Sequence, residues 1–170
     1  MLLAFGVRRM RRPTLGRVVF AAWAVIAMAG LTKAANAADR LEIGVIKYAA
    51  GDATIGRAGG GSIVASVGAS VFKDDKVLTG PGGAVGFILN DGSRFSVGPN
   101  SAIVVSDFKF EPAQGLFGLL ARLLYGVMTF SSGDIGRLSP GSVKIESAYG
   151  AVSVRGTRFA IRQPKPLAKP

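Results

Sequence analysis

The 170-residue chain contains neither cysteine nor histidine. Without cysteine it can form no disulfide, so its stability has to come from an ordinary hydrophobic core. The same absences exclude a cysteine nucleophile, a Ser-His-Asp triad, an imidazole general base and a zinc site built from histidine and cysteine. We therefore expect a protein that is not an enzyme, with no catalytic residues, no metal site and no cofactor.

Acidic residues are missing from the first 37 positions, whereas six of the 21 lysines and arginines lie there. The other 133 residues hold 15 basic and 10 acidic side chains, a net charge of +5 against +11 for the whole chain. That balance is too weak for a dedicated nucleic-acid binder, whose basic residues form a dense patch or stripe. We expect no nucleic-acid partner.

The first 37 residues have the three parts of an export signal. Basic residues up to Arg17 precede an uncharged apolar run at 18–31, and Ala35-Asn36-Ala37 follows with the small residues that signal peptidase requires. The apolar run is shorter than the ~20 residues that span a bilayer. We expect a signal peptide at 1–37, cleaved before Ala38, and a periplasmic or secreted protein. The alternative is that the segment is not cleaved and anchors the protein in the inner membrane. The domain would then face the periplasm and touch the membrane only through this segment.

The rest of the chain has the pattern of an all-β domain. Short runs of valine, isoleucine and phenylalanine alternate with glycine-rich turns about every 8–12 residues, which favours an antiparallel-rich β-sandwich or a short solenoid-like domain. Residues 83–97 predict a hairpin, because Asp91-Gly92 suits the positive φ values of a tight turn. Residues 98–101, Gly-Pro-Asn-Ser, predict a second turn. Further strands are expected near 43–48, 53–58, 62–67 and 76–79.

One segment allows two interpretations. Five leucines between 115 and 125 recur at helical spacing, which predicts a short amphipathic helix near 116–124, although two glycines weaken it. The segment would then pack on the sheet or, in the second interpretation, form a surface for a membrane or a partner. We favour packing. A strand at the same place is the alternative.

The acidic residues give little support to catalysis. A glycosidase needs two carboxylates facing each other across a cleft. Most acidic residues here lie in turn dipeptides, where their side chains form hydrogen bonds with the backbone of the turn. Asp107, Asp134 and Glu146 are the candidates for an envelope carbohydrate enzyme, which stays an alternative.

Two arginines lie close to the end of the chain in a strand-like segment. Arg155 and Arg158 are separated by Gly156 and Thr157, and glycine permits a bulge at this point. We expect Arg155 to pair with a carboxylate such as Asp107 or Glu146, since the guanidinium binds a carboxylate bidentately. An exposed recognition site is the alternative.

Taken in order, these motifs resemble the FecR-type domain over residues 43–163. The Asp-Gly-Ser turn at 91–93, the turn at 98–101 and the segment 126–133 (G-x-x-x-F-x-S-G) come before a closing V-R-G-T-x-F signature. The residues that carry the resemblance are Asp91, Gly92, Ser93, Gly98, Asn100, Ser101, Val154, Arg155, Gly156, Thr157 and Phe159. The resulting division is a signal peptide, a FecR-like β domain at 38–163 and a disordered Pro/Lys tail at 164–170.

The resemblance implies a periplasmic all-β domain that binds and signals. The best-known members relay the state of an outer-membrane TonB-dependent receptor to a cytoplasmic sigma factor, through a sigma-binding segment that precedes a transmembrane helix. Here only about 17 residues precede the apolar run, too few for such a domain. We therefore expect an exported, non-enzymatic binding or scaffold module, whose partner is another envelope protein or a cell-wall component. A membrane-tethered regulator of a sigma-factor and receptor system is the alternative. The resemblance also favours a strand over a helix at 116–130.

Overall fold

The computed structural model describes residues 40–153 and 158–165. The predicted signal peptide, the signature residues Val154, Arg155, Gly156 and Thr157 and most of the predicted tail lie outside these residues. Within the described part, no helix is long and apolar enough to cross a membrane.

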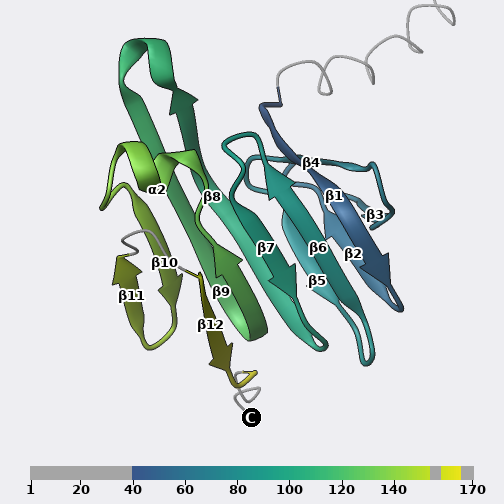
Figure 1. Ribbon diagram of the computed structural model, residues 1–170. Coiled ribbons are helices and arrows are strands. Elements are labelled where there is room, and N and C mark those ends of the chain that lie inside the picture. Colours follow the sequence, from purple (N-terminus) through teal and green to yellow (C-terminus); the bar gives the residue numbers. More distant parts are fainter. Residues whose placement is uncertain (1–39, 154–157, 166–170) are drawn as a thin grey trace, which may run out of the picture. The chain divides into compact units, whose positions relative to one another are not determined.

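The described residues form twelve strands and two short helices (Figure 1). In chain order the strands are β1 (Glu42–Ala50), β2 (Ala53–Gly56), β3 (Ser62–Val64), β4 (Ser70–Phe72), β5 (Lys76–Thr79), β6 (Ala84–Leu89), β7 (Arg94–Val97), β8 (Ser101–Glu111), β9 (Leu116–Ser131), β10 (Val143–Ser147), β11 (Gly150–Ser153) and β12 (Arg158–Gln163). The helices are η1 (Pro112–Gln114) and α2 (Asp134–Leu138).

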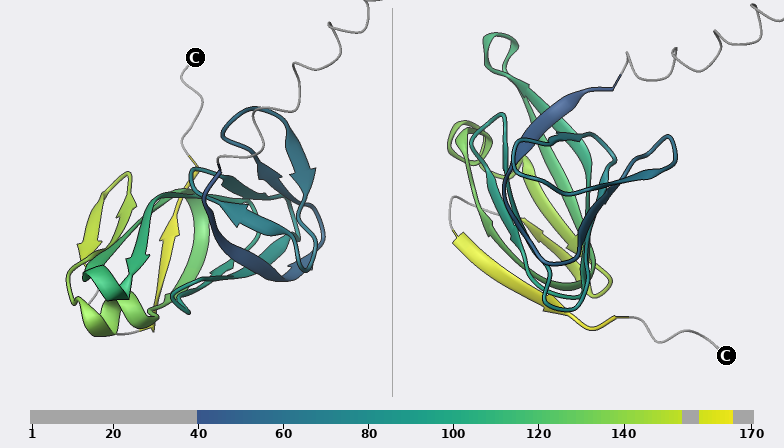
Figure 2. Two further views of the ribbon diagram at one scale, coloured as in Figure 1. Left: turned by 90° about the horizontal axis from the view of Figure 1, so that it is seen from above. Right: turned by 90° about the vertical axis from the view of Figure 1, so that its right-hand side faces the viewer.

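The strands join in one sheet in the order β3-β2-β5-β8-β9-β7-β6-β1-β4, and β10 and β12 pair with β9 in addition. Among the described strands all pairs are antiparallel except β9 with β10. The sheet curls so that its strands surround a common interior (Figure 2). The prediction of an all-β, antiparallel-rich fold is confirmed.

Strand β9 joins the two halves of this sheet, which are β3-β2-β5-β8 on one side of it and β7-β6-β1-β4 on the other. Its first part pairs with β8 and β10, and its last part, from Gly126, pairs with β7 and β12. The strand changes partners at Gly126. Its backbone φ is +96°, a value that residues with a side chain rarely adopt. A Cβ at this position would lie 2.4 Å from the Cα of Ser101 on β8, so only glycine fits here.

The core fills the space inside the curl. A chain of aromatic rings crosses from β6 to β12, with ring centres 4.8 Å apart for Phe87–Phe95 and Phe95–Phe130, and 5.5 Å apart for Phe130–Phe159. The other half of the sheet contributes fully buried aliphatic residues such as Ile103. Each such side chain stabilises the fold by roughly 1.5–3 kcal/mol relative to exposure. The alternation predicted for the 83–97 hairpin is confirmed, since its apolar positions are the buried ones.

The helix considered for 116–124 is wrong, because this segment is the first part of β9. Its side chains alternate as a strand requires: Leu119, Ala121 and Leu123 are buried, and the residues between them are partly or fully exposed. Pairing along most of both strands satisfies the backbone groups of β8 and β9, whereas a helix at 116–124 would have left this edge of β8 without a partner strand. The leucine spacing fits both periods, and the long-range pairing decides between them.

Candidate functional site

The first motif, Asp91-Gly92-Ser93, forms a lock between β6 and β7, that is, a turn held by buried side-chain hydrogen bonds. Asp91 is 2% exposed and Ser93 is fully buried. One carboxylate oxygen of Asp91 accepts a 3.0 Å hydrogen bond from the Ser93 N–H, and the other accepts one of 2.7 Å from Ser93 Oγ. Gly92 has a φ of +81°, as expected at this turn.

The same turn also fixes the start of α2, 40 residues further along the chain. The N–H of Gly133 donates to Ser93 Oγ at 3.0 Å, and the N–H of Asp134 donates to the Asp91 carbonyl at 2.7 Å. The N–H of Ile135 lies 3.4 Å from Asp91 Oδ2, so a carboxylate serves the first turn of the helix, where N–H groups have no partner of their own. A Cβ on Gly133 would lie 2.3 Å from the Asp91 carbonyl oxygen. Two separate sequence motifs thus form one structural unit.

The second motif, Gly98-Pro99-Asn100-Ser101, forms the equivalent lock at the other end of the sheet. Buried Ser101 accepts a 2.9 Å hydrogen bond from the Val127 N–H through Oγ, and its own N–H donates to Thr79 Oγ1 at 3.0 Å. Asn100 has the positive φ, +50°, that its place in the turn demands. Gly98 lies so close to Val127 that a Cβ would come within 2.5 Å of its Cγ1.

The last motif is described only in part. Phe159, on β12, is half-buried and packs against Phe130 in the aromatic chain. The side chain of Arg158 is exposed. Arg155 lies outside the described residues, so its pairing with a carboxylate stays a prediction.

The candidate carboxylates do not form a facing pair. Asp107 on β8 and Glu146 on β10 lie on opposite sides of β9, where they pair with Leu120 and Arg122, two positions apart. Glu146 instead forms an ion pair with Arg122 of β9, 2.6 Å from Nε to Oε2, with both side chains well exposed. Asp134 begins α2 and pairs with Arg137 at 3.3 Å. Among the described residues no group of three or more acidic side chains could hold a metal ion.

A buried ion pair was missed by the sequence reasoning. Arg57, after β2, binds Asp75, before β5, and the Asp75 side chain is fully buried. The same guanidinium donates to the Ser70 carbonyl at 3.1 Å and lies 4.9 Å from the centre of the Phe72 ring. These contacts connect β4, at one end of the strand order, with β2 and β5 near the other end. No local pattern marks two residues 18 positions apart as partners, so this pair could not be predicted from the sequence alone.

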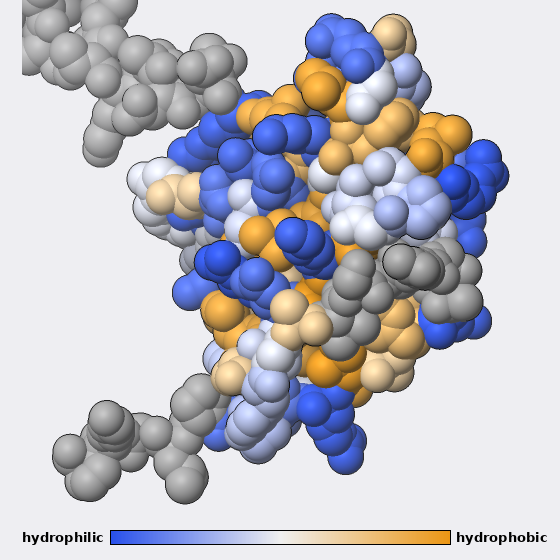
Figure 3. All heavy atoms as spheres, turned by 90° about the vertical axis from the view of Figure 1, so that its left-hand side faces the viewer, coloured by the Kyte–Doolittle hydropathy of each residue, from blue (hydrophilic) through white to orange (hydrophobic). Residues whose placement is uncertain are grey.

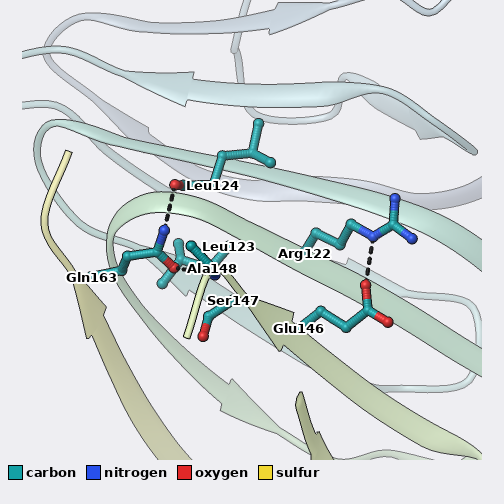
Figure 4. Close-up of a pocket in the computed structure, with 7 residues that line it drawn as sticks. All are labelled: Arg122, Leu123, Leu124, Glu146, Ser147, Ala148 and Gln163. Carbon is teal, nitrogen blue, oxygen red and sulfur yellow. Dashed lines mark hydrogen bonds and ion pairs between the residues drawn. The ribbon is translucent and has the colours of Figure 1, made fainter. Parts of the chain in front are cut away.

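One small pocket opens where β10 and β12 part from β9 (Figure 4). Gln163 spans its base: the side-chain amide donates to the Leu124 carbonyl at 2.7 Å, and its oxygen accepts from the Ala148 N–H at 3.0 Å. Arg122 and Glu146 neutralise each other at its rim. At about 240 Å³ it is smaller than the ~300–1,000 Å³ typical of ligand sites, and its polar groups already have partners.

Hydrophilic and hydrophobic residues are interspersed on the side of the molecule that carries β10, β11 and α2 (Figure 3). Exposed apolar side chains occur on different parts of the sheet, for example Val64 on β3 at 73% and Tyr149 after β10 at 78%. The described surface therefore has both charged and apolar exposed positions.

Comparison with known proteins gives one family. The model of the family described as "FecR protein" matches residues 75–167, more than half of the chain. No curated protein matches the sequence. A solved structure titled "Cell surface anchoring domain" is 31% identical over 36% of this chain and 80% of its own, with a TM-score of 0.35.

The chain therefore belongs to the FecR family. The match includes all the motif residues described above, from the lock at Asp91 to Phe159. Membership in this family fits a module associated with the cell envelope.

Proposed function

We infer that this protein is an exported FecR-domain module that binds a component of the bacterial cell envelope and catalyses no reaction. The observation that carries the proposal is the family match over 75–167, joined to the export pattern of residues 1–37. The partner is another envelope protein or a cell-wall component, reached on the periplasmic side of the inner membrane.

The use of the motif residues supports a scaffold role. The polar side chains of Asp91, Ser93 and Ser101 are buried and spend their hydrogen bonds on backbone groups and on one another. A catalytic group has to reach a substrate with its reactive atom, and these do not. The motifs of the family thus fix turns and strand crossings, and recognition falls to the exposed residues between them.

Cell fractionation combined with the mass of the mature protein tests this function. An exported module is expected in the periplasmic fraction with Ala38 as its first residue. A chain that begins at Met1 in the membrane fraction would support the tethered regulator instead, with 18–31 as its anchor. A chain that stays in the cytoplasm contradicts both.

A further inference from the structure

The outer face of the sheet formed by β6, β7, the end of β9 and β12 carries positive charge without a compensating acid. Phe95, Phe130 and Phe159 lie opposite one another and point into the core. Because side chains alternate along a strand, the next row, Arg94–Ser131–Arg158, points outwards. Both arginines are exposed. They flank Ser131 on neighbouring strands, which places their backbones about 10 Å apart.

A third arginine lies at the other end of the same face. Arg162 is exposed, pairs with Val127, and stands four positions from Arg158 on β12, about 13 Å along the strand. The strands β6, β7 and β12 and the part of β9 from Gly126 contain no acidic residue. Among the described residues no carboxylate lies within ion-pair distance of these three arginines.

The surface between the arginines is shallow and hydroxylated. The row Gly86–Ser96–Thr129–Ala160 carries only small side chains. Two hollows adjoin here and share Val127: one of about 270 Å³, which includes Ser96 and Thr129, and one of about 310 Å³, which includes Asn100 and Arg162. A chain lying in them could exchange hydrogen bonds with these hydroxyl and amide groups.

An aromatic side chain borders the face on the neighbouring strand. Tyr48 of β1 lies opposite Gly86 and is 56% exposed. The negative face of an aromatic ring attracts the weakly positive C–H groups of a sugar ring. Arginine binds carboxylates bidentately. A flat face with hydroxyls, one exposed aromatic ring and unpaired arginines suits a linear chain of acidic sugars better than a protein helix, which needs deep apolar pockets for its anchors.

We propose that this face, defined by Arg94, Arg158, Arg162, Ser96, Thr129 and Tyr48, binds an acidic polysaccharide whose sugar units carry carboxylates. The arginines bind the carboxylates, the hydroxyls bind the sugar hydroxyls, and Tyr48 stacks on a sugar ring. The proposal rests on the binding function inferred above and names the chemical class of the cell-wall component.

Calorimetry of polygalacturonate binding tests the proposal. The protein is purified in the form that its own cell produces. The double variant Arg94→Gln/Arg158→Gln is expected to bind about tenfold more weakly, since each lost charge-assisted contact lowers the affinity. The variant Tyr48→Ala is expected to lose several-fold. The matched control Lys76→Gln/Lys109→Gln removes two exposed charges from the other half of the sheet and is expected to bind as the wild type does.

Two further probes separate this ligand from other occupants. Neutral dextran is expected not to bind, and poly-L-glutamate, an acidic chain without sugars, is expected to bind at least about tenfold more weakly than polygalacturonate. Tighter or equal binding of poly-L-glutamate would assign the face to an acidic protein and overturn the proposal. So would an equal loss in the two double variants, or no binding of polygalacturonate. Because fractionation tests export independently, a failure here leaves the proposed function standing, with a different partner.

Discussion

Ser101 lies so close to Gly126 that a Cβ on the glycine would be 2.1 Å from the serine Oγ. The same Oγ accepts a hydrogen bond from the N–H of Val127, the next residue. The serine closes the 98–101 turn, and the glycine opens the 126–133 motif. Two motifs that the sequence shows as separate signals therefore form one joint, at which β9 leaves β8 and joins β7.

The joint predicts a strong response to Gly126→Ala. The new methyl group would overlap Ser101, and the φ of +96° is unfavourable for alanine. Together these effects should lower the free energy of unfolding by about 3 kcal/mol. Urea unfolding measures the loss. Gly60→Ala is a matched control, because Gly60 has the same φ but no atom within 4 Å of the Cβ position, so it should cost only about 1 kcal/mol. Equal losses in the two variants would show that the joint is not tightly packed.

The lock at the β6–β7 turn predicts that Asp91→Ala destabilises the protein. The substitution leaves the N–H and Oγ of Ser93 and the N–H of Ile135 without their acceptor in a buried place. We expect a loss of about 3 kcal/mol and a lower Tm. Glu111→Ala, at an exposed position, serves as the control and should leave the Tm nearly unchanged. A wild-type Tm for the Asp91 variant contradicts the lock.

The ion pair of Arg57 with Asp75 predicts that the protein loses more stability when one partner is removed than when both are. Arg57→Met leaves the buried carboxylate unpaired and should cost about 3–5 kcal/mol. Adding Asp75→Leu removes that charge and should restore much of the loss. Arg137→Met breaks an exposed pair and should cost less than about 0.5 kcal/mol. Chemical denaturation of Arg57→Met, of Asp75→Leu, of the double variant and of Arg137→Met forms the test, and additive losses for the two members of the buried pair would contradict their coupling.

The pairing of Arg155 with a carboxylate stays a prediction from the sequence, because Arg155 lies outside the described residues. If Arg155 meets a buried carboxylate, Arg155→Ala should destabilise the fold by about 3–5 kcal/mol and change binding less than stability. Arg158→Ala, at an exposed position, is the control for stability. An unchanged Tm for the Arg155 variant would favour an exposed recognition role.

The parts of the fold that sequence reasoning found have local signals. The hairpin around Asp91-Gly92 has a turn dipeptide and strict alternation, and both hold in the structure. The leucines of 116–124 fit a helix and a strand equally well, and only the pairing with β8 separates the two. The three-residue strand β4 and the five-residue helix α2 are too short for a periodic pattern.

The candidate site shows the same division. The motif residues were found because their order resembles that of the FecR-type domain, but the sequence could not show that Ser93 reaches Gly133 or that Ser101 reaches Gly126. The outward row of Arg94 and Arg158 depends on the register of three strands, which no local pattern states. Contacts between distant segments are therefore what the structure adds.

The mass of the protein recovered from the periplasmic fraction tests the account most directly. An exported FecR-domain module predicts a chain that begins at Ala38, free of the 1–37 leader, in that fraction. An intact chain beginning at Met1, whether found in the membrane or in the cytoplasm, would contradict it.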